Sequence, residues 1–554
     1  MDAIVISQKA ISISTFPYTV RTLGTPSTDA GRRVQRSSKR GQECGRVDYN
    51  RLRWTQGCVS ISGISRRIER AYVSPVGRPY SITNATAEDR GGGGGAAVVS
   101  IQDKEVQLSG ARDTEEENGG TQETGVIVIG GGLAGLAAAR YLAMEGIPFR
   151  IVEASDGVGG RVRTDNLRGF LLDRGFQIHI TAYPEAARIL DYAKLDLRNF
   201  YAGASVWFDG GFHRVADPFR HFTDGLLSLT NPIGSVFDKV MVGVVRAQAA
   251  VKSEEEILSS KETSIEERLF RTGFSTAMVD RFFRPFFGGI FFDRELHTTS
   301  RLFDFVFKCL ALGSNTLPAS GIGAIPEQLA AGLPESSILL NSKVVELVED
   351  GSAGPVVGVK LENGRELTAK YGVVVAVEGS EAARLLGAKL PTTPSVAQPP
   401  RSTVCLYFSS DKSPTTEPIL FLNGSGKGIV NNMFFPSTVA QTYAPPGKTL
   451  VSVSLIGTFH ENSDADLELR VREELSEWFG TEVVGAWEHL RTYRIPFAQP
   501  NQCPPTDLLK NPRLSDSVYV CGDHRDSSTF DGALVSGRRA VQALIADKVV
   551  LSSG

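Results

Sequence analysis

Residues 126–164 read VIVIGGGLAGLAAARYLAMEGIPFRIVEASDGVGGRVRT, and this stretch decides the fold. The β-branched run Val126 to Ile129 predicts a buried parallel strand. A G-x-G-x-x-G turn, Gly130–Gly135, follows it, and then small and apolar residues recur at helical spacing. A second predicted strand, Phe149–Val152, ends on Glu153. A strand, glycine turn, helix, strand and acid in this order predict a dinucleotide-binding unit.

The three glycines of the turn, the helix N-terminus and the acid each have a physical role. Gly130 permits the tight turn, Gly132 lets backbone amides approach a pyrophosphate, and Gly135 lets the helix pack close to the strand. The helix N-terminus offers free N–H groups and a positive dipole to the phosphates. Glu153 can accept hydrogen bonds from both ribose hydroxyls. Its carboxylate would repel a 2′-phosphate, which disfavours NADP.

A second glycine-rich turn follows the acid and separates FAD from NAD. Gly157, Gly159, Gly160, Arg161 and Thr164 form the pattern G-x-G-G-R-x-x-T. This pattern resembles the second signature of the flavin-containing amine oxidase and phytoene desaturase superfamily. There the arginine and its neighbouring amides lie against the phosphates and the flavin. The resemblance therefore implies a noncovalently bound FAD that Gly159, Gly160 and Arg161 contact.

The C-terminal part of the chain extends the resemblance. Val518–Asp523 is a short apolar strand that breaks at Gly522-Asp523, and Gly532-Ala533 opens a predicted helix. In the superfamily the matching acid lies on the ribitol-pyrophosphate region, and the next helix N-terminus faces the flavin. The resemblance thus places Gly522, Asp523, Gly532 and Ala533 in the FAD site.

The middle of the chain resembles the family more loosely. Leu317–Pro326 looks like the family segment P-x-G-G-M-x-x-I-P, although Ile322-Gly323 stands where glycine and methionine are usual. Val344, in the predicted strand Ile338–Val345, matches the residue whose backbone contacts the adenine. The resemblance covers about residues 125–550 and implies the fold and the cofactor, but it does not imply the substrate.

The implied fold class is α/β, with a Rossmann-like FAD-binding domain of the glutathione-reductase-like, amine oxidase type interleaved with an α+β substrate domain. We expect the FAD-binding domain in three parts, 125–205, 325–395 and 505–554. The substrate domain is expected in two parts. Residues 206–324 contain helical patterns such as Ile265–Thr272 and Thr276–Phe287, and 396–504 contain alternating strands such as Ser402–Phe408 and Thr449–Ile456.

The N-terminal region differs in composition from the rest. Residues 1–80 carry 14 Lys and Arg against 5 Asp and Glu, which leaves 45 basic and 57 acidic residues in the remainder of the 554-residue chain. A basic, hydroxyl-rich leader without an apolar core predicts an organellar transit peptide over 1–95, with chloroplast favoured over mitochondrion. Residues 96–124 are expected to be a flexible linker. The acidic remainder argues against nucleic acid as a partner.

An aromatic insert, Phe282–Phe292, contains six phenylalanines in eleven residues. It could line an apolar substrate cavity, dip into a membrane surface as a peripheral contact, or simply pack in the core. Arg284 within it could pair with Asp293 or Glu295, or meet a substrate carboxylate. The sequence leaves these alternatives open.

Metal ligands and a protein nucleophile are not expected. The seven histidines are dispersed without ligand spacing, and the six cysteines form no C-x-x-C pair. His524 follows Gly522-Asp523, so it is expected close to the flavin, where it either tunes the ring or caps the turn. Because the cofactor performs the hard chemistry, no catalytic residue can be named.

Several functions remain open within this family. The first is an FAD-dependent oxidoreductase that desaturates or isomerises a carotenoid-like polyene or other isoprenoid, with oxygen or a quinone as electron acceptor. An amine or polyamine oxidase and a protoporphyrinogen-type tetrapyrrole oxidase are the enzymatic alternatives. A flavoprotein that only binds a pigment is the alternative of another class.

Overall fold

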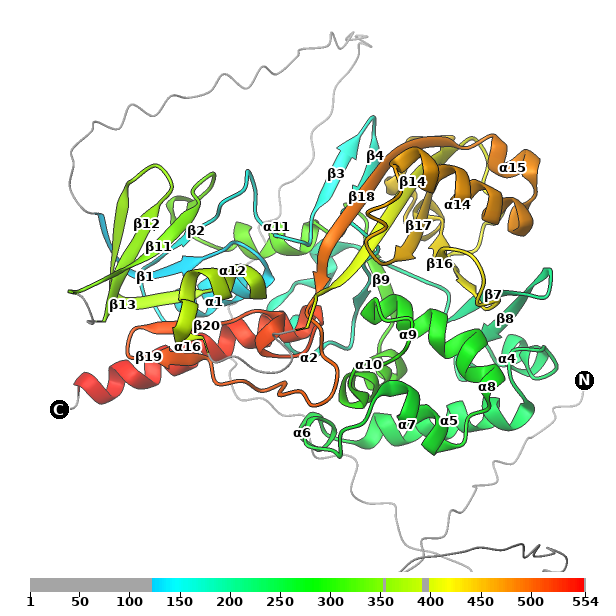
Figure 1. The fold of residues 1–554 in the computed structure, drawn as a ribbon, viewed down its shortest axis with the longest axis horizontal. Coiled ribbons are helices and arrows are strands. Elements are labelled where there is room, and N and C mark those ends of the chain that lie inside the picture. The colour runs from blue at the N-terminus through cyan, green and yellow to red at the C-terminus, as the bar shows by residue number, and fades with distance from the viewer. Residues whose placement is uncertain (1–121, 352–354, 391–397, 553–554) are drawn as a thin grey trace, which may run out of the picture. The chain divides into compact units, whose positions relative to one another are not determined.

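The computed structural model describes residues 122–351, 355–390 and 398–552. The expected transit peptide, 1–95, and nearly all of the expected linker, 96–124, lie outside the described residues. The described part of the chain contains two large sheets, one on each side of Figure 1, with a group of helices below the second.

The first sheet has eight strands and a parallel core. Its order is β10-β2-β1-β13-β12-β11, and β20 pairs with the second half of β13 while β19 pairs with β20. The bounds are β1 Gln122–Ile129, β2 Phe149–Val152, β10 Ile338–Leu339, β11 Val344–Glu349, β12 Val356–Leu361, β13 Glu366–Val375, β19 Arg513–Ser515 and β20 Val518–Val520. Strands β10, β2, β1, β13 and β20 run parallel. The predicted strand Ile338–Val345 is therefore wrong in extent, because it is divided between β10 and β11.

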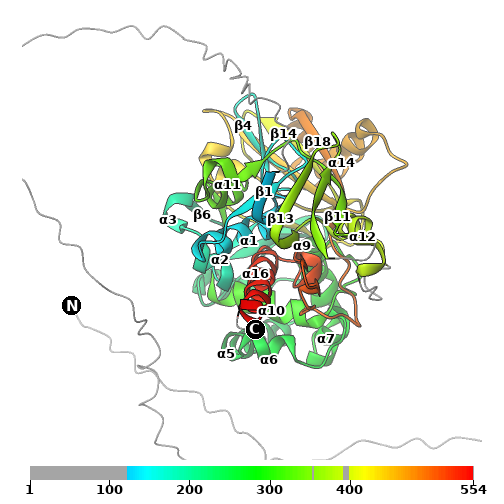
Figure 2. The same ribbon diagram turned by 90° about the vertical axis from the view of Figure 1, so that its left-hand side faces the viewer.

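Two long helices cover one face of this sheet. They are α1, Leu133–Met144, and α16, Phe530–Ser552, which pack against each other beside β1 (Figure 2). Their contact is close because small residues meet: a Cβ added to Gly537 would lie 2.3 Å from the carbonyl oxygen of Ala134. Helix α16 begins two residues before the predicted Gly532, because the Thr529 hydroxyl accepts a hydrogen bond from the Gly532 N–H. These elements confirm the predicted α/β class.

The second sheet has seven strands in the order β18-β14-β17-β16-β15-β7-β8. The bounds are β7 Gly203–Phe208, β8 Gly211–Ala216, β14 Arg401–Ser410, β15 Leu420–Asn423, β16 Val430–Phe434, β17 Thr449–Ile456 and β18 Glu488–Gln499. Helix α14, Asp464–Phe479, packs on one face through Leu467, Val471 and Leu475. The boundary expected after residue 205 falls inside β7, and the division into five domain parts stays a prediction.

The helical insert lies between the two parts of this second sheet in the sequence. It comprises α4 Phe222–Ser228, α5 Val236–Val251, α6 Glu254–Leu258, α7 Ile265–Thr272, α8 Thr276–Met278, η1 Val279–Phe283, α9 Arg284–Phe291 and α10 Ser300–Leu312. The predicted helix Thr276–Phe287 is continuous through η1, which is a single stretch of π-helix. Short stretches of π-helix frequently occur at functional sites of proteins.

Smaller elements complete the described chain. They are β3 Thr164–Leu167, β4 Phe170–Asp173, β5 His179–Ile180, β6 Leu197–Asn199, β9 Asn315–Pro318, α2 Pro184–Ile189, α3 Tyr192–Leu195, α11 Ala324–Ala331, α12 Gly379–Leu386, α13 Pro436–Val439 and α15 Thr481–Gly485. Short 3₁₀ turns are η2 Glu335–Ser337, η3 Gly387–Lys389, η4 Gln441–Tyr443 and η5 Asp523–Arg525. Among the described helices, none is long and apolar enough to cross a membrane.

Candidate functional site

A cavity of about 430 Å³ lies between the two sheets. Its first half is formed where parallel strands end: Gly130 follows β1, Glu153 follows β2, Ala376 follows β13 and Gly522 comes just after β20. Ligands of parallel α/β sheets bind at this carboxyl edge. Its second half comes from β14, β15, β16 and β18 of the second sheet and from α9 of the helical insert. The carboxyl edge of the first sheet, where a dinucleotide would bind, and a wall formed by the second sheet and α9 therefore face the same cavity.

Most of the predicted cofactor residues meet in this cavity. Those that line it are Gly130, Gly132, Glu153, Gly159, Gly160, Arg161, Gly522, Asp523 and Ala533. Gly135 lies behind the lining, where an added Cβ would be 2.0 Å from the Gly130 carbonyl oxygen, so its close packing fits the role expected from the sequence. Gly532 also lies behind the lining, where an added Cβ would be 2.1 Å from the Ser527 carbonyl oxygen.

Val344, like Gly135 and Gly532, is not among the residues that line the cavity. Its side chain is buried, and its carbonyl oxygen accepts a hydrogen bond from Arg384 at 3.2 Å. This carbonyl retains one further acceptor position. The adenine assignment of Val344 therefore stays a prediction.

The glycine turns form a cradle of the kind that a pyrophosphate needs. Gly132 is the N-cap of α1 and provides no side-chain capping hydrogen bond, so the first N–H groups of the helix have no capping partner. A Cβ added to Gly132 would meet nothing within 4 Å, and one added to Gly160 would meet only the Gly132 Cα at 3.5 Å. The two glycine turns are held together because the Gly159 N–H donates to the Gly131 carbonyl at 2.8 Å. The open space and the free donors fit a bound diphosphate.

Glu153 is held in place at the end of β2. Its Oε2 accepts from the Gly131 N–H at 2.6 Å, and its Oε1 accepts from the Ser155 N–H at 2.8 Å and the Ser155 hydroxyl at 2.7 Å. Oε1 thus has both acceptor positions occupied, whereas Oε2 retains one. Glu153 can therefore accept a hydrogen bond from a ribose hydroxyl at Oε2 without rearranging.

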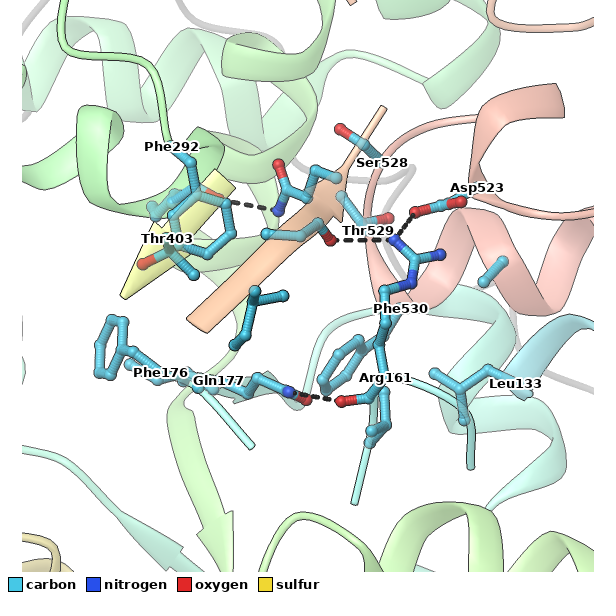
Figure 3. A pocket seen from close by; sticks show the side chains of 18 of the residues that line it. Leu133, Arg161, Phe176, Gln177, Phe292, Thr403, Asp523, Ser528, Thr529 and Phe530 are labelled. Atoms are coloured by element: carbon cyan, nitrogen blue, oxygen red, sulfur yellow. Dashed lines mark hydrogen bonds and ion pairs between the residues drawn. The ribbon is translucent and has the colours of Figure 1, made fainter. Parts of the chain in front are cut away.

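Arg161 and Asp523 join the two ends of the chain across the cavity. Arg161 Nη1 donates to Asp523 Oδ2 at 2.8 Å and to the Ala498 carbonyl at 2.9 Å, and the Arg161 carbonyl accepts from Gln177 at 2.9 Å (Figure 3). Burial alone would raise the pKa of Asp523, but pairing with Arg161 keeps that pKa below its usual value. Asp523 Oδ1 is buried and has no partner among the described residues. This carboxylate is therefore charged and has a free acceptor for a hydroxyl of the cofactor.

The buried Asp173 connects Thr164 of the second glycine-rich turn with Ile322 and with Tyr443 of η4. Asp173 accepts hydrogen bonds from the Thr164 hydroxyl at 2.6 Å, the Ile322 N–H at 3.0 Å and the Tyr443 hydroxyl at 2.8 Å. Burial raises the pKa of Asp173 to about 6. Gly323 lies against Thr164, because its N–H donates to the Thr164 hydroxyl at 2.9 Å. The unusual Ile322-Gly323 pair of the sequence is thus the segment that closes around Thr164.

The second half of the cavity is apolar. Its wall is formed by Phe176, Ile178, Phe200, Pro285, Phe286, Ile290, Phe292, Leu310, Leu420, Leu422, Ile495 and Phe497, with Gln177, Tyr201, Asn315, Thr403, Asn432 and Gln499 as polar members. The acids among the described lining residues are Glu153, Glu378 and Asp523, all from segments that follow strands of the first sheet. The wall that faces them from the second sheet and the helical insert carries no carboxylate among the described residues.

The aromatic insert divides between two of its expected roles. Phe286 and Phe292 line the cavity together with Ile290. Phe283, Phe287 and Phe291 are fully buried in the core, where Phe287 packs against Phe303 with ring centroids 4.7 Å apart. The division follows from helical spacing, because residues three and four apart share one face of α9.

Of the alternatives left open for Arg284, the pair with Glu295 is present and the pair with Asp293 is not. Arg284 pairs with Glu266 at 2.8 Å and Asp280 at 3.0 Å and reaches Glu295 only at 3.9 Å. Asp293 pairs instead with Arg401 at 3.0 Å. Arg284 is therefore not an arginine held free for a substrate carboxylate, since three acids of its own helical insert surround it.

His524 does not line the cavity, and its predicted place close to the flavin, where it would tune the ring or cap the turn, stays a prediction. It is buried next to Gly522 and Gly379. Burial lowers the pKa of His524 to about 4, so its imidazole is neutral at physiological pH.

Reactive groups are scarce around the cavity. No cysteine, histidine or lysine is found among its described lining residues. Cys521 is buried in the strand region, and burial raises the pKa of its thiol to about 12. Within the described ranges, no group of three or more His, Cys, Asp or Glu could hold a metal ion. These surroundings suit a noncovalent organic cofactor that supplies the chemistry itself.

Several lining residues carried no signal in the sequence. Phe176, Gln177 and Asn432 lie in segments without a recognised motif, although each lines the cavity. Phe497 lies in the Tyr493–Pro500 segment, and its ring is 5.4 Å from the Arg161 guanidinium carbon. The second sheet brings Asn432 of β16 and Phe497 of β18 to the cavity, and the segment between β4 and β5 brings Phe176 and Gln177. Spacing along the chain could not identify any of them.

Comparison with known families agrees with this geometry. The sequence model of the family described as flavin containing amine oxidoreductase matches residues 133–545. This range begins within the first glycine turn, at Leu133, and contains the second glycine-rich turn and the Gly522-Asp523 turn near the C-terminus.

Individual relatives are distant. The chain is 22% identical over 475 residues to a chloroplastic/chromoplastic 15-cis-phytoene desaturase of an Oncidium hybrid cultivar, covering 76% of this chain and 78% of the relative. It is 29% identical over 164 residues to chloroplastic/mitochondrial protoporphyrinogen oxidase 2 of Arabidopsis thaliana, a match that spans only 32% of that protein. An oxidoreductase from Methanosarcina mazei has a similar structure, with a TM-score of 0.60 and 17% identity over 76% of this chain and all of the other. The structural likeness supports the fold.

Proposed function

The chain belongs to the flavin-containing amine oxidoreductase family and is an FAD-dependent enzyme, and from this premise we propose that it desaturates or isomerises a hydrophobic polyene or related isoprenoid. The observation that carries the proposal is the apolar, carboxylate-free wall opposite the cofactor edge of the cavity. Burying apolar ligand surface there is favourable by about 25 cal/mol per Å². A cationic amine would need carboxylates or an aromatic cage in the same place.

We propose that the glycine turns bind FAD noncovalently. The N–H groups at the start of α1 would hold the diphosphate, Glu153 the adenosine ribose, and Arg161 with Asp523 the flavin end. Gly130, Gly159, Gly160, Gly522 and Ala533 supply the backbone that approaches the cofactor. The free oxygen of Asp523 and the open space at Gly132 support this assignment.

Bound FAD would supply the redox chemistry by accepting a hydride equivalent from a C–H bond. The residues of this chain would orient an extended ligand and exclude water from the reacting carbon. Phe286, Phe292 and Ile290 form the apolar part of this surface, and Gln177 is fixed by its bonds to the Arg161 and Arg174 carbonyls. No protein acid or base is proposed, and the electron acceptor, oxygen or a quinone, stays open.

The alternatives fit the cavity less well. A polyamine would meet no carboxylate on the wall opposite the cofactor edge, and a tetrapyrrole would bring carboxylates to a wall whose lining cations are Arg161 and Arg174. Both arginines are already paired, with Asp523 and Asp165. A flavoprotein that only binds a pigment would share the apolar wall, so the discriminating property is transfer of electrons to the flavin.

Binding of candidate ligands to the oxidised holoenzyme tests the substrate class. We expect an acyclic C40 polyene to perturb the flavin absorbance and spermine to leave it unchanged. Ile290→Asp would place a carboxylate on the apolar wall and should weaken polyene binding by at least tenfold, because a buried charge is costly. Ile290→Leu is the matched control and should bind as the wild type does. Binding of spermine but not of the polyene would contradict the proposal, provided that both variants retain flavin.

We also propose that the enzyme contacts a membrane through α4, α5 and the segment before them. This surface, the α4–α5 face, exposes Phe219, Phe222, Leu226, Leu227, Val236, Phe237, Val240, Val244 and Val251. The acids between residues 218 and 251 are Asp224, which pairs with Arg214, and Asp238, which is buried. An apolar face without exposed carboxylates, with Arg220 beside it, suits an anionic bilayer.

The α4–α5 face adjoins the cavity. Arg246 of α5 donates to the Ala311 carbonyl at 2.9 Å, at the end of α10. Leu310 in the same turn lines the cavity, and Leu312 is 56% exposed. A membrane-dissolved substrate would therefore have a short path to the apolar wall. The aromatic insert, by contrast, is too buried for the membrane role considered from the sequence.

Sedimentation with vesicles tests the membrane contact. The holoenzyme should pellet with phosphatidylcholine vesicles containing phosphatidylglycerol, and Phe222→Ser combined with Phe237→Ser should weaken binding by about tenfold or more. Leu469→Ser, at a 58% exposed position of α14, is the control and should bind normally. Wild-type protein that stays in the supernatant would contradict the contact, and so would a double variant that changes only the oligomeric state.

A plastid location is proposed together with this function. It is supported by the basic, hydroxyl-rich composition of the first 95 residues. The word chloroplastic in the names of two relatives supports it as well.

A further inference from the structure

The apolar wall of the cavity contains one polar side chain whose hydrogen-bonding donor is not used. Asn432 of β16 lines the cavity and is 2% exposed. Its Nδ2 has no hydrogen-bond partner among the described residues. A buried donor without a partner is unfavourable in the free protein and is rare in native structures. We therefore expect the ligand of the cavity to provide the acceptor for Asn432 Nδ2.

The surrounding packing fixes which end of this amide is free. Asn432 Oδ1 accepts from Asn431 Nδ2 at 2.9 Å, and Asn431 Nδ2 also donates to the Pro285 carbonyl at 2.9 Å. Gly289 of α9 allows this approach, since an added Cβ would lie 2.8 Å from Asn431 Nδ2 and 3.1 Å from Asn432 Oδ1. The oxygen of Asn432 is thus occupied, which leaves the NH₂ group as the available end.

The second sheet places this donor within a polar row on an otherwise apolar face. Asn432 pairs directly with Leu422 of β15 and Ser454 of β17, and directly paired residues point to the same side of a sheet. Leu422, Pro285, Gly289 and Asn432 all line the cavity. Ser454 is also buried. Leu422 is apolar and Ser454 is polar but neutral, so the donor has no charged neighbour in this row.

We infer that the substrate carries a neutral oxygen, a hydroxyl or a carbonyl, that accepts a hydrogen bond from Asn432 Nδ2. This inference rests on the proposed function and narrows it from a polyene to an oxygen-bearing polyene or isoprenoid. A carboxylate is disfavoured because the lining arginines, Arg161 and Arg174, are already paired with acids. A pure hydrocarbon would leave the donor unsatisfied and would bind less tightly.

Paired ligands and paired variants test this role. The probes are an acyclic C40 polyene hydrocarbon and its terminal hydroxy derivative, delivered in the same detergent micelles to the oxidised holoenzyme. The wild type should bind the hydroxy derivative about tenfold more tightly, and Asn432→Leu should abolish this preference while it retains hydrocarbon binding. Thr403→Val is the control, because the Thr403 hydroxyl lines the cavity but already donates to the Leu455 carbonyl at 2.8 Å. This variant should keep the preference.

The outcomes separate the inference from the proposed function. Equal binding of both polyenes to the wild type, or a preference that survives Asn432→Leu, would overturn the role of Asn432 while leaving a polyene enzyme intact. Failure of both polyenes to bind or to reduce the flavin would instead overturn the proposed function. Flavin content and thermal unfolding of each variant show whether Asn432→Leu acts through folding.

Discussion

Replacement of Glu153 by arginine is expected to produce a folded protein without flavin. Glu153 lies at the carboxyl end of β2 and holds the Gly131 N–H at 2.6 Å, so the substitution removes an anchor of the first glycine turn as well as the ribose acceptor. A hydrogen bond from a ribose hydroxyl to this carboxylate contributes about 1.5–3 kcal/mol, and the bond from the Gly131 N–H, which holds the turn, contributes a similar amount. Their loss corresponds to at least a hundredfold weaker binding of FAD.

Acid precipitation measures the FAD content and shows whether the FAD is bound noncovalently. Trichloroacetic acid should release all of the yellow colour of the wild type into the supernatant, because no cysteine or histidine lies among the described lining residues. Glu153→Arg should yield almost none, whereas Glu335→Arg, at an exposed position of η2, should match the wild type. Colour that remains in the wild-type pellet would exclude noncovalent binding. Full FAD occupancy of Glu153→Arg would exclude the ribose assignment.

Local patterns predicted individual helices and strands in both halves of the molecule, and the cofactor turns, closely. The strand Phe149–Val152, the helix Ile265–Thr272 and the strand Thr449–Ile456 have the same bounds in the structure as in the sequence analysis. The glycine turns were predictable because backbone approach to a diphosphate allows few residue types. Gly159 has a φ of +108° and Gly160 a φ of +58°, which are conformations that favour glycine.

The residues of the cavity wall in the substrate half could not be predicted in the same way. Asn432 reads as one position of an ordinary buried strand, and only its pairing with β15 and β17 makes it part of a cavity wall. Asp173 likewise gains its role from Ile322 and Tyr443, which are far away in the sequence. Such contacts depend on how strands assemble, and a single sequence does not encode them in its spacing.

The aromatic insert shows why composition alone is ambiguous. Phe286 lines the cavity and Phe287 is fully buried in the core, although they are neighbours in the sequence. A helix turns each successive side chain by about 100°, so one aromatic run serves both purposes. His524 shows the same ambiguity, since its ring lies against Gly379 and Gly522 and does not line the cavity.

Rapid reduction of the bound flavin by the substrate is the second large effect that we predict, and it directly tests the proposed substrate class. Under the proposed function, the apolar wall would orient an extended polyene against the flavin, whereas an amine would find no carboxylate on that wall. Holding the reacting carbon close to the cofactor contributes most of the acceleration, so reduction should be orders of magnitude faster for a bound substrate than for an unbound one.

Anaerobic stopped-flow mixing of the holoenzyme with a series of polyenes, polyamines and a reduced tetrapyrrole measures it directly. We predict rapid bleaching of the oxidised flavin band by an oxygen-bearing polyene or a related isoprenoid, and no bleaching by spermine, spermidine or the tetrapyrrole within the same time. Rapid bleaching by a polyamine or the tetrapyrrole, with none by any isoprenoid, would contradict the account.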